Sequence, residues 1–367
     1  MSATSPDIVI LGLSLSSAWG NGHATTYRAL IAGLHKLGCK VLFLERNVPW
    51  YADHRDLPDP EFCELRFYDS LEELASRYDR HIREANAVIV GSYLPDGVAV
   101  LDHVLATARG TTAFYDIDTP VTLAKLARGD EEFLERRQIP SLDIYFSFAG
   151  GKNLDRLERE FGARRALPLY CSVQAERYQP TGEEHRWDLG YIGTYSSDRQ
   201  PGLERLLLEP ARRLPDRRFL VAGPQYPDIA WPSNVERIEH LSPTLHAPCY
   251  SRQRFTLNLT RVDMIRAGWS PSVRLFEAGA CRTPVISDVW QGIEELFPDG
   301  EAILLARSSD DVVRMLTETA EEERNAIAGA AQARVLREHT GEKRAEQLLR
   351  FLKTSSKTEA LAATYQT

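Results

Sequence analysis

The chain has 367 residues, 43% of them hydrophobic, which is enough for two ordinary domains with buried cores. A formal net charge of -8 argues against a protein that grips nucleic acid through a broad basic face. The five cysteines are scattered and form no CxxC pair, which argues against a disulfide framework or a zinc site and favours a reducing compartment.

The first residues, MSATSPDIVILGL, show neither the positive start of a signal peptide nor an apolar run long enough to cross a membrane. We therefore expect a cytoplasmic protein without a transmembrane segment. The apolar run at 8–13 is predicted to be a first buried strand.

Four further apolar runs in the first half have the length and composition of strands that are buried on both faces. These predicted strands are 40–45, 87–93, 111–118 and 143–149. Residues 24–38 have helical spacing and stop at a glycine. Alternating strands and helices predict a doubly wound parallel sheet, and we place this first domain at 1–178.

The pattern restarts after a polar linker at 179–186. Apolar runs then predict the strands of a second sheet, at 187–194, 218–223, 255–260, 283–288 and 302–306. We place a second domain at 187–335. Residues 310–352 are predicted to be helical, and we assign 336–353 as a last, separate helix. A polar, mobile tail is expected at 354–367.

Two residues of the first half are candidates for acid–base chemistry. His23 lies at the start of the first predicted helix, where it could take a proton from a substrate hydroxyl. Asp96 follows a strand and could orient that histidine. Structural interpretations stay open for both, because histidine is common at helix starts and Asp96 stands in a Pro-Asp-Gly turn.

Asp116 and Asp118 form an Asp-x-Asp triplet at the end of a predicted strand. Such a triplet can hold a divalent metal, but it is common by chance and here precedes a proline. We expect these two residues to bind a substrate or to shape the loop, and we predict no metal site.

The loop GTYSSDR follows the first strand of the second half and contains Gly193, Ser196, Ser197 and Arg199. A small, hydroxyl-rich turn at this place is where α/β proteins cradle phosphate groups. The loop contains no GxGxxG sequence, so an ordinary connection between strand and helix is the alternative.

Polar residues also follow the strand FTLNLT. Asn258 and Arg261 are expected to point toward a ligand, and Arg261 is the better candidate for a phosphate contact. Capping of the next helix is the alternative for Asn258. Between two strands, the stretch around Ile238 and His240 offers a place for a base to stack, and only its position supports this.

The segment Ser270–Ala280 is the strongest motif of the chain. A helix that opens near Ser272 presents unpaired amides, which suit a diphosphate. Arg274 can add a charge-assisted bond to that diphosphate, and Glu277, one turn later, can accept ribose hydroxyls. The alternative is a surface helix with an Arg–Glu pair.

Together these motifs resemble the GT-B glycosyltransferases, and within them the CgeB-like (spore-maturation-type) group. The resemblance is carried by GYIGTYSSDR, NLTR and SPSVRLFEAGACRTPVISDVWQGIEELF, and it covers roughly 185–340. The first half matches in pattern only.

The resemblance implies two facing Rossmann-like domains with a central cleft and a C-terminal helix that crosses back. It also implies that the second domain binds a nucleotide-sugar through Gly193, Arg274 and Glu277, and that the first domain binds the acceptor, for which Asp116 and Asp118 are our candidates. No tightly bound metal or cofactor is implied. UDP is favoured by base rate alone, and the acceptor stays open among glycan, protein, lipid and small metabolite.

One departure bears on mechanism. Many retaining members of the family carry two glutamates eight positions apart, and the second matches Glu277, but the first would fall at Trp269. Inversion with His23 as the base is therefore the expectation. A sugar-nucleotide epimerase using Asp96, Asp116 and Glu295 is one alternative, and a non-catalytic nucleotide-sugar-binding descendant is another.

Overall fold

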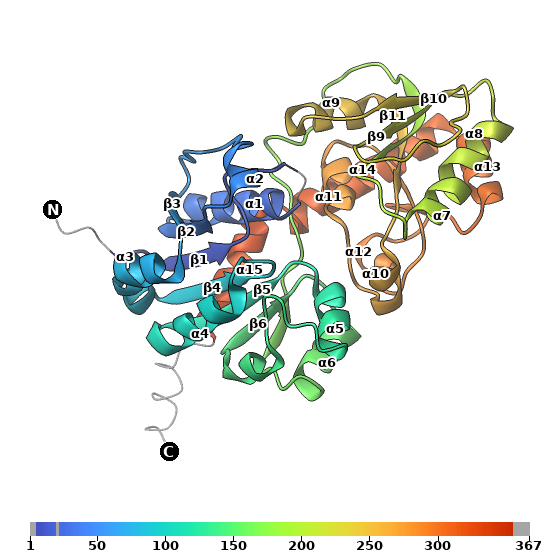
Figure 1. Cartoon of the computed structure of the whole chain (residues 1–367). Helices are drawn as coiled ribbons and strands as arrows, with labels where there is room; N and C mark the ends of the chain where they lie inside the picture. The colour runs from blue at the N-terminus through green and yellow to red at the C-terminus, as the bar shows by residue number, and fades with distance from the viewer. Residues whose placement is uncertain (1–4, 20–21, 355–367) are drawn as a thin grey trace. The chain divides into compact units, whose positions relative to one another are not determined.

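The computed structural model describes residues 5–19 and 22–354 (Figure 1). The chain forms two compact units. The first contains the residues up to Ser172 and those from Gly341 onward, and the second runs from Val173 to Thr340. Of the mobile tail predicted at 354–367, all but Thr354 lies outside the described residues.

A seven-stranded parallel sheet in the order β3-β2-β1-β4-β5-β6-β7 forms the centre of the first unit. Its strands are β1 (Ile8–Gly12), β2 (Val41–Arg46), β3 (Glu64–Tyr68), β4 (Ala87–Gly91), β5 (Thr111–Asp116), β6 (Ile144–Ser147) and β7 (Ala166–Pro168). The five strands expected from apolar runs are present. The sequence did not reveal β3 and β7, because both are edge strands and only part of each is buried.

Helices flank this sheet and cover its apolar side chains (Figure 1). They are α1 (His23–Lys36), α2 (Pro49–Ala52), α3 (Leu71–Glu84), α4 (Gly97–Thr107), α5 (Thr119–Ala127), η1 (Arg136–Ser141), α6 (Lys152–Arg159) and α15 (Gly341–Lys353). Strands β1 and β4 are buried along their whole length, so the core of this unit lies on both faces of the central strands.

Helix α15 packs on α1 through two glycines. A Cβ on Gly33 would lie 2.3 Å from the carbonyl oxygen of Gly341, and a Cβ on Gly341 would lie 2.0 Å from that of Ala29. The two backbones are therefore in direct contact, and neither position has room for a side chain.

We expect Gly33→Ala to destabilise the first unit by about 2 kcal/mol, because the new methyl group forces the α15 backbone away from α1. Gly329→Ala is the control, since its Cβ would meet only Arg282 Nη2 at 3.8 Å. Urea unfolding of the full chain measures the difference. Equal stability of the two variants would contradict the close packing of α1 and α15.

The second unit contains a six-stranded parallel sheet in the order β10-β9-β8-β11-β12-β13. Its strands are β8 (Trp187–Ile192), β9 (Phe219–Ala222), β10 (Val235–Ile238), β11 (Gln253–Asn258), β12 (Val285–Ser287) and β13 (Leu304–Leu305). Two parallel sheets, each flanked by helices, confirm the predicted α/β class with two Rossmann-like domains. The polar edge strand β10 was not predicted, because two of its four residues, Glu236 and Arg237, are charged.

The helices of the second unit are α7 (Gln200–Leu203), η2 (Glu204–Leu208), α8 (Glu209–Arg213), η3 (Pro243–Leu245), α9 (His246–Ser251), α10 (Val262–Ala267), α11 (Val273–Ala280), α12 (Ile293–Leu296), α13 (Ser309–Glu318) and α14 (Glu321–Glu338). In the described part of the chain, no helix has the length and apolar character needed to span a membrane.

The helical region predicted at 310–352 contains three helices, and the last of them begins at Gly341 rather than at the predicted 336. Helix α13 begins at a capping box in which Ser308 and Asp311 satisfy each other's backbone N–H groups. Helix α14 ends at Glu338, and the carbonyl oxygen of the next residue, His339, accepts a hydrogen bond from the N–H of Val173 at 3.1 Å. The chain leaves the helix at this point because Thr340 pairs with Val173 in a short β-bridge.

Candidate functional site

The strand order of the second sheet marks one place for a ligand. The chain proceeds from β8 outward to β9 and β10, and then returns to place β11 on the other side of β8. Ligands of open α/β sheets bind beyond the carboxyl ends of the strands at such a reversal. Here these ends are Ile192 of β8 and Asn258 of β11.

Arg274 of α11 joins the two strand ends. Its Nε and Nη2 donate to the carbonyl oxygen of Ile192 at 2.9 and 2.6 Å, and its Nη1 donates to Asn258 Oδ1 at 2.9 Å. The guanidinium also lies over the ring of Tyr191, 4.8 Å from the centroid. The side chain therefore fixes the point of reversal as well as placing a positive charge there.

That charge is buried, and no carboxylate of the described residues contacts it directly. Arg274 is 8% exposed, and none of the ion pairs of the described residues includes its guanidinium. Asp288 acts on it from a longer distance, since the charge of Arg274 opposes the rise that burial causes in the pKa of that carboxyl. An anionic ligand would supply the direct partner that the protein does not.

The N-terminus of α11 points to the same chemistry. Its Ncap residue, Ser272, makes no capping hydrogen bond, because its hydroxyl donates to Asn258 Oδ1 at 2.7 Å instead. The first amides of α11 therefore have no side-chain cap and retain their partial positive charge. The arrangement fits the predicted role of Ser272 and Arg274 at a phosphate group.

Gly193 brings the backbone close to Arg274. A Cβ at this residue would lie 2.6 Å from the Tyr191 hydroxyl and 3.0 Å from Arg274 Nη2. Gly223 then leaves space for Gly193, because a Cβ there would lie 2.1 Å from the Gly193 carbonyl oxygen. Only glycine fits these two positions, and the loop after β8 can lie directly against the arginine.

The rest of the predicted phosphate loop is engaged differently. Asp198 accepts a hydrogen bond from Ser196 and another from the N–H of Val262 at 3.2 Å, and it lies 3.8 Å from Arg261 Nε. Ser196 and Arg261 thus both interact with the Asp198 carboxylate of the protein. An anion does not favour a position beside Asp198, which sets these two residues apart from Arg274.

Ser197 is exposed, and Arg199 Nη2 donates to the Thr194 carbonyl oxygen at 2.9 Å. A small recess beside this loop is lined by three buried polar atoms that have no hydrogen-bond partner among the described residues: Tyr191 Oη, Arg199 Nε and Gln200 Oε1. The recess leaves no room for a water molecule, so these atoms stay unsatisfied in this arrangement of the loop. The sequence analysis did not predict this recess.

Glu277 is buried one turn after Arg274, and its Oε2 accepts a hydrogen bond from Tyr250 at 3.1 Å. Ile238 ends strand β10, and His240 is exposed two residues later. Because all strands of the sheet are parallel, the carboxyl end of β10 at Ile238 lies at the same end of the sheet as the carboxyl end of β8 at Ile192. The structure brings Gly193, Asn258, Ser272 and Arg274 into contact, with Glu277 adjacent, and places His240 two strands away.

A carboxylate that the sequence analysis did not identify connects the loops at the carboxyl ends of two strands. Asp288 follows β12 and accepts from the N–H and the hydroxyl of Thr260, both at 2.8 Å. Burial raises the pKa of the Asp288 carboxyl. Asn258 adds a hydrogen bond to Ser287 at 2.9 Å. The loops after β11 and β12 are thereby tied together behind Arg274.

The first sheet has a reversal of its own, between β1 and β4, and His23 lies there at the start of α1. Its Nε2 is 4.0 Å from Asp118 Oδ2, and its ring packs edge-on against Tyr93. Burial lowers the pKa of His23 to about 4, so the imidazole is neutral at pH 7. No hydrogen-bond partner for its Nδ1 is found among the described residues.

Asp96 does not orient His23, contrary to the predicted pairing. It adopts a left-handed backbone conformation before α4, and its carboxylate pairs with Arg46 at 3.5 Å. The turn interpretation of Pro-Asp-Gly accounts for this placement. The acid beside His23 is Asp118.

Asp116 was expected either to bind a substrate or to shape the loop, and its contacts are those of a residue that shapes the loop. Its carboxylate is fully buried and accepts hydrogen bonds from the hydroxyls of Tyr145 at 2.6 Å and Thr122 at 2.8 Å. Burial raises the pKa of Asp116 to about 6. The residue supports the loop that carries Asp118. No cluster of three or more metal-ligating side chains occurs in the described ranges.

Comparisons with known proteins agree with this architecture. Residues 199–350 match a family model described as "Glycosyl transferase-like", which covers less than half of the chain. No curated protein matches the sequence significantly.

Solved structures match nearly the whole chain. Sucrose-phosphate synthase from Thermosynechococcus elongatus is 13% identical with a TM-score of 0.68, over 95% of this chain and 98% of that one. Anabaena Alr3699/HepE, solved in complex with UDP and glucose, is 12% identical with a TM-score of 0.67, over 95% and 100%. An alpha-glucosyltransferase in complex with UDP and DNA is 10% identical with a TM-score of 0.67, over the same shares.

Identities this low establish the fold alone, and membership of the CgeB-like group stays a prediction. The two parallel α/β sheets and their likeness to these structures show that the chain has the GT-B glycosyltransferase fold, with a glycosyl transferase-like segment at 199–350.

Proposed function

We propose that the chain is a glycosyltransferase that moves a sugar from a nucleotide-sugar, with a UDP-sugar favoured, to an acceptor hydroxyl. The observation that carries this proposal is the buried Arg274, which no described carboxylate contacts directly, at the reversal of the second sheet and beside the uncapped start of α11. The glycosyl transferase-like match and the UDP bound in structural neighbours support it.

In this proposal the second unit binds the donor. The diphosphate lies against the Gly193 backbone, the first amides of α11 and the two N–H bonds of Arg274 that the protein leaves unused. It lies closer to Arg274 than to Asp198, whose charge opposes it. Glu277 accepts from the ribose, and the base lies near Ile238 and His240.

The first unit supplies the acceptor and the base. The acceptor oxygen bonds to the anomeric carbon as the bond from that carbon to the diphosphate breaks, and the acceptor proton passes to the neutral His23. Asp118, 4.0 Å away, stabilises the imidazolium that forms. Arg274 and the helix start stabilise the leaving diphosphate, so no tightly bound metal is needed for that role. The acceptor attacks on the face opposite the diphosphate, and this single displacement inverts the anomeric carbon.

The epimerase alternative is less well supported. It would need free carboxylates for proton transfer, but Asp116 is buried and hydrogen-bonded, Asp96 pairs with Arg46, and Glu295 accepts from the indole N–H of Trp269 at 3.0 Å. These engagements favour transfer over epimerisation.

Turnover of UDP-, GDP- and dTDP-sugars tests the proposal, with release of the nucleoside diphosphate as the readout. We expect slow hydrolysis of at least one donor without an acceptor and faster release with one. Appearance of solvent deuterium in recovered donor would support the epimerase, and donor binding with no turnover would support a non-catalytic protein. Either result would contradict the proposal.

A further inference from the structure

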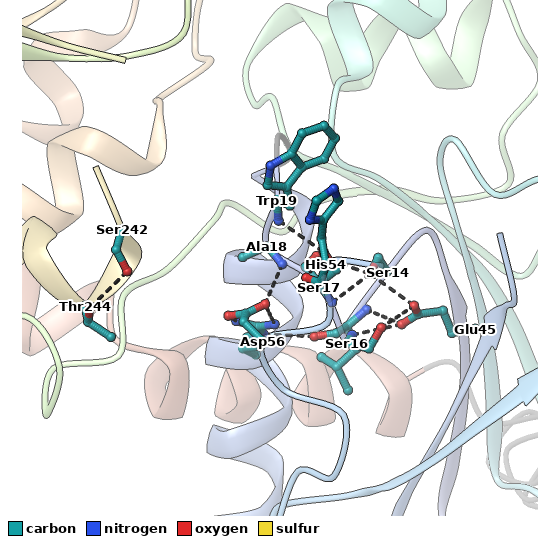
Figure 2. Close-up of polar contacts among 12 residues, drawn as sticks. Ser14, Ser16, Ser17, Ala18, Trp19, Glu45, His54, Asp56, Ser242 and Thr244 are labelled. Carbon is teal, nitrogen blue, oxygen red and sulfur yellow. Dashed lines mark hydrogen bonds and ion pairs between the residues drawn. The ribbon is translucent and has the colours of Figure 1, made fainter. Parts of the chain in front are cut away.

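The loop after β1 in the first unit is held by a buried carboxylate. Glu45 of β2 is fully buried and accepts hydrogen bonds from the N–H of Leu15 at 2.6 Å, the N–H of Ser16 at 2.9 Å and the Ser16 hydroxyl at 2.6 Å (Figure 2). In doubly wound sheets, the amides of this first loop are where a phosphate binds. Here an internal anion occupies them, so the loop does not attract a phosphate-bearing ligand.

A second set of contacts fastens the same loop to the segment after α2. Arg28 of α1 is buried, donates to the Leu15 carbonyl oxygen at 2.9 Å, and pairs with both carboxylate oxygens of Asp56 at 2.7 and 2.8 Å. Asp56 in turn accepts from the N–H of Ala18 at 2.8 Å (Figure 2). The loop is thus rigid up to the residue before Trp19.

The rigid loop holds Trp19 in an exposed position. Its indole stacks on the imidazole of His54, with ring centroids 4.3 Å apart and an angle of 17° between the planes. Trp19 is nevertheless 51% exposed. In Figure 2 the two rings project together, away from Glu45. Keeping so much indole in water costs apolar burial, whereas a pre-ordered aromatic surface loses little entropy when it binds a ligand.

The charge around this surface indicates the class of ligand. Residues 53–61 contain three aspartates and one glutamate against a single arginine, and Arg28 pairs with one of these acids, Asp56. The net negative charge that remains on the segment disfavours nucleic acid, phosphorylated ligands and anionic membranes. A neutral sugar ring fits instead, because its C–H face stacks on an indole and its hydroxyls donate to carboxylates.

We propose that Trp19, backed by His54, is a stacking platform for a neutral sugar ring in the first unit, and that the acceptor of the proposed transfer is therefore a saccharide or glycoside. The statement about the acceptor rests on the proposed function. Binding of a saccharide to the platform does not, since it requires no donor.

The test is fluorine NMR of the full chain labelled with 5-fluorotryptophan, in which Trp19→Phe assigns the Trp19 signal. Glucose, maltotriose, cellotriose and chitotriose are titrated without nucleotide. We expect a saturable shift of the Trp19 signal with at least one saccharide and none at Trp50, which is similarly exposed at 56%. By calorimetry, Trp19→Ala raises the Kd for that saccharide at least about tenfold, Trp19→Phe raises it less, and Trp50→Ala leaves it unchanged.

Thermal unfolding checks that each variant is folded. We expect the Trp19 variants to fold, because about half of the Trp19 surface is already exposed to solvent. The proposed platform is contradicted if no saccharide shifts the Trp19 signal, or if only phenol or lipid vesicles shift it. If donor turnover is found while no saccharide shifts Trp19, the platform falls and the proposed transfer stands. If saccharides bind at Trp19 but no donor is turned over, the platform stands and the proposed transfer falls.

Discussion

Replacing Arg274 with alanine is expected to raise the Kd for a nucleoside diphosphate by about 100-fold, which corresponds to about 2.7 kcal/mol. The reason is that the variant loses the buried charge at the reversal of the second sheet. It also removes the Arg274 hydrogen bonds to the Ile192 carbonyl oxygen and to Asn258 Oδ1, which keeps the bond from the Ser272 hydroxyl. Calorimetric titration with UDP measures the change.

Arg274→Ala would also lose binding if the second unit unfolded, which is a concern because buried acceptors without donors lower stability. Arg274→Lys keeps the charge, but a single ammonium cannot reach both strand ends, so we expect an intermediate Kd in a folded protein. Arg213→Ala is the control, since Arg213 pairs with Asp310 on the surface. Full affinity in folded Arg274→Ala would contradict the donor site.

His23→Gln is expected to lower the rate of transfer by about 100-fold or more, because glutamine fills similar space but cannot accept the proton. Donor binding should stay unchanged, since His23 belongs to the first unit and Arg274 to the second. Steady-state kinetics separate the two effects. A kcat equal to that of the unmodified chain would exclude His23 as the base.

The pH dependence follows from the same residue. Burial lowers the pKa of His23 to about 4, so the neutral base persists well below pH 6.5. The unfolded chain takes up this proton near pH 6.5, whereas the folded chain resists it until about pH 4. His23 therefore reduces stability as the pH falls between these values, by about 3 kcal/mol in full.

NMR titration of the His23 ring should give a midpoint near 4, and urea unfolding at pH 7.5 and 4.5 should show a smaller acid loss in His23→Gln than in the unmodified chain. Comparison with the variant cancels the opposite effect of Asp116, which both proteins share. A midpoint near 6.5 would contradict the burial of His23.

The sequence predicted the fold well because parallel strands buried on both faces are apolar along their whole length. It failed at β3, β7 and β10, which lie at sheet edges and are only partly buried. The last helix was predicted to begin at 336 instead of at Gly341, since helical spacing does not reveal that Thr340 forms a bridge with Val173.

At the candidate site, the helix start and its arginine were predictable because capping residues and charges lie within one turn of each other. The partners of side chains were not predictable. Asp118 rather than Asp96 neighbours His23, Asp198 engages Ser196, and Glu45 occupies the first loop. Each of these contacts depends on which loops lie next to each other at the carboxyl ends of the strands. The periodicity of the sequence does not contain that information.

The most direct test of the donor site is a crystal structure of the chain with bound UDP. We predict diphosphate density against the Gly193 backbone, the start of α11 and Arg274. Clear density for UDP on the first unit, with this edge of the second sheet empty, would contradict the account.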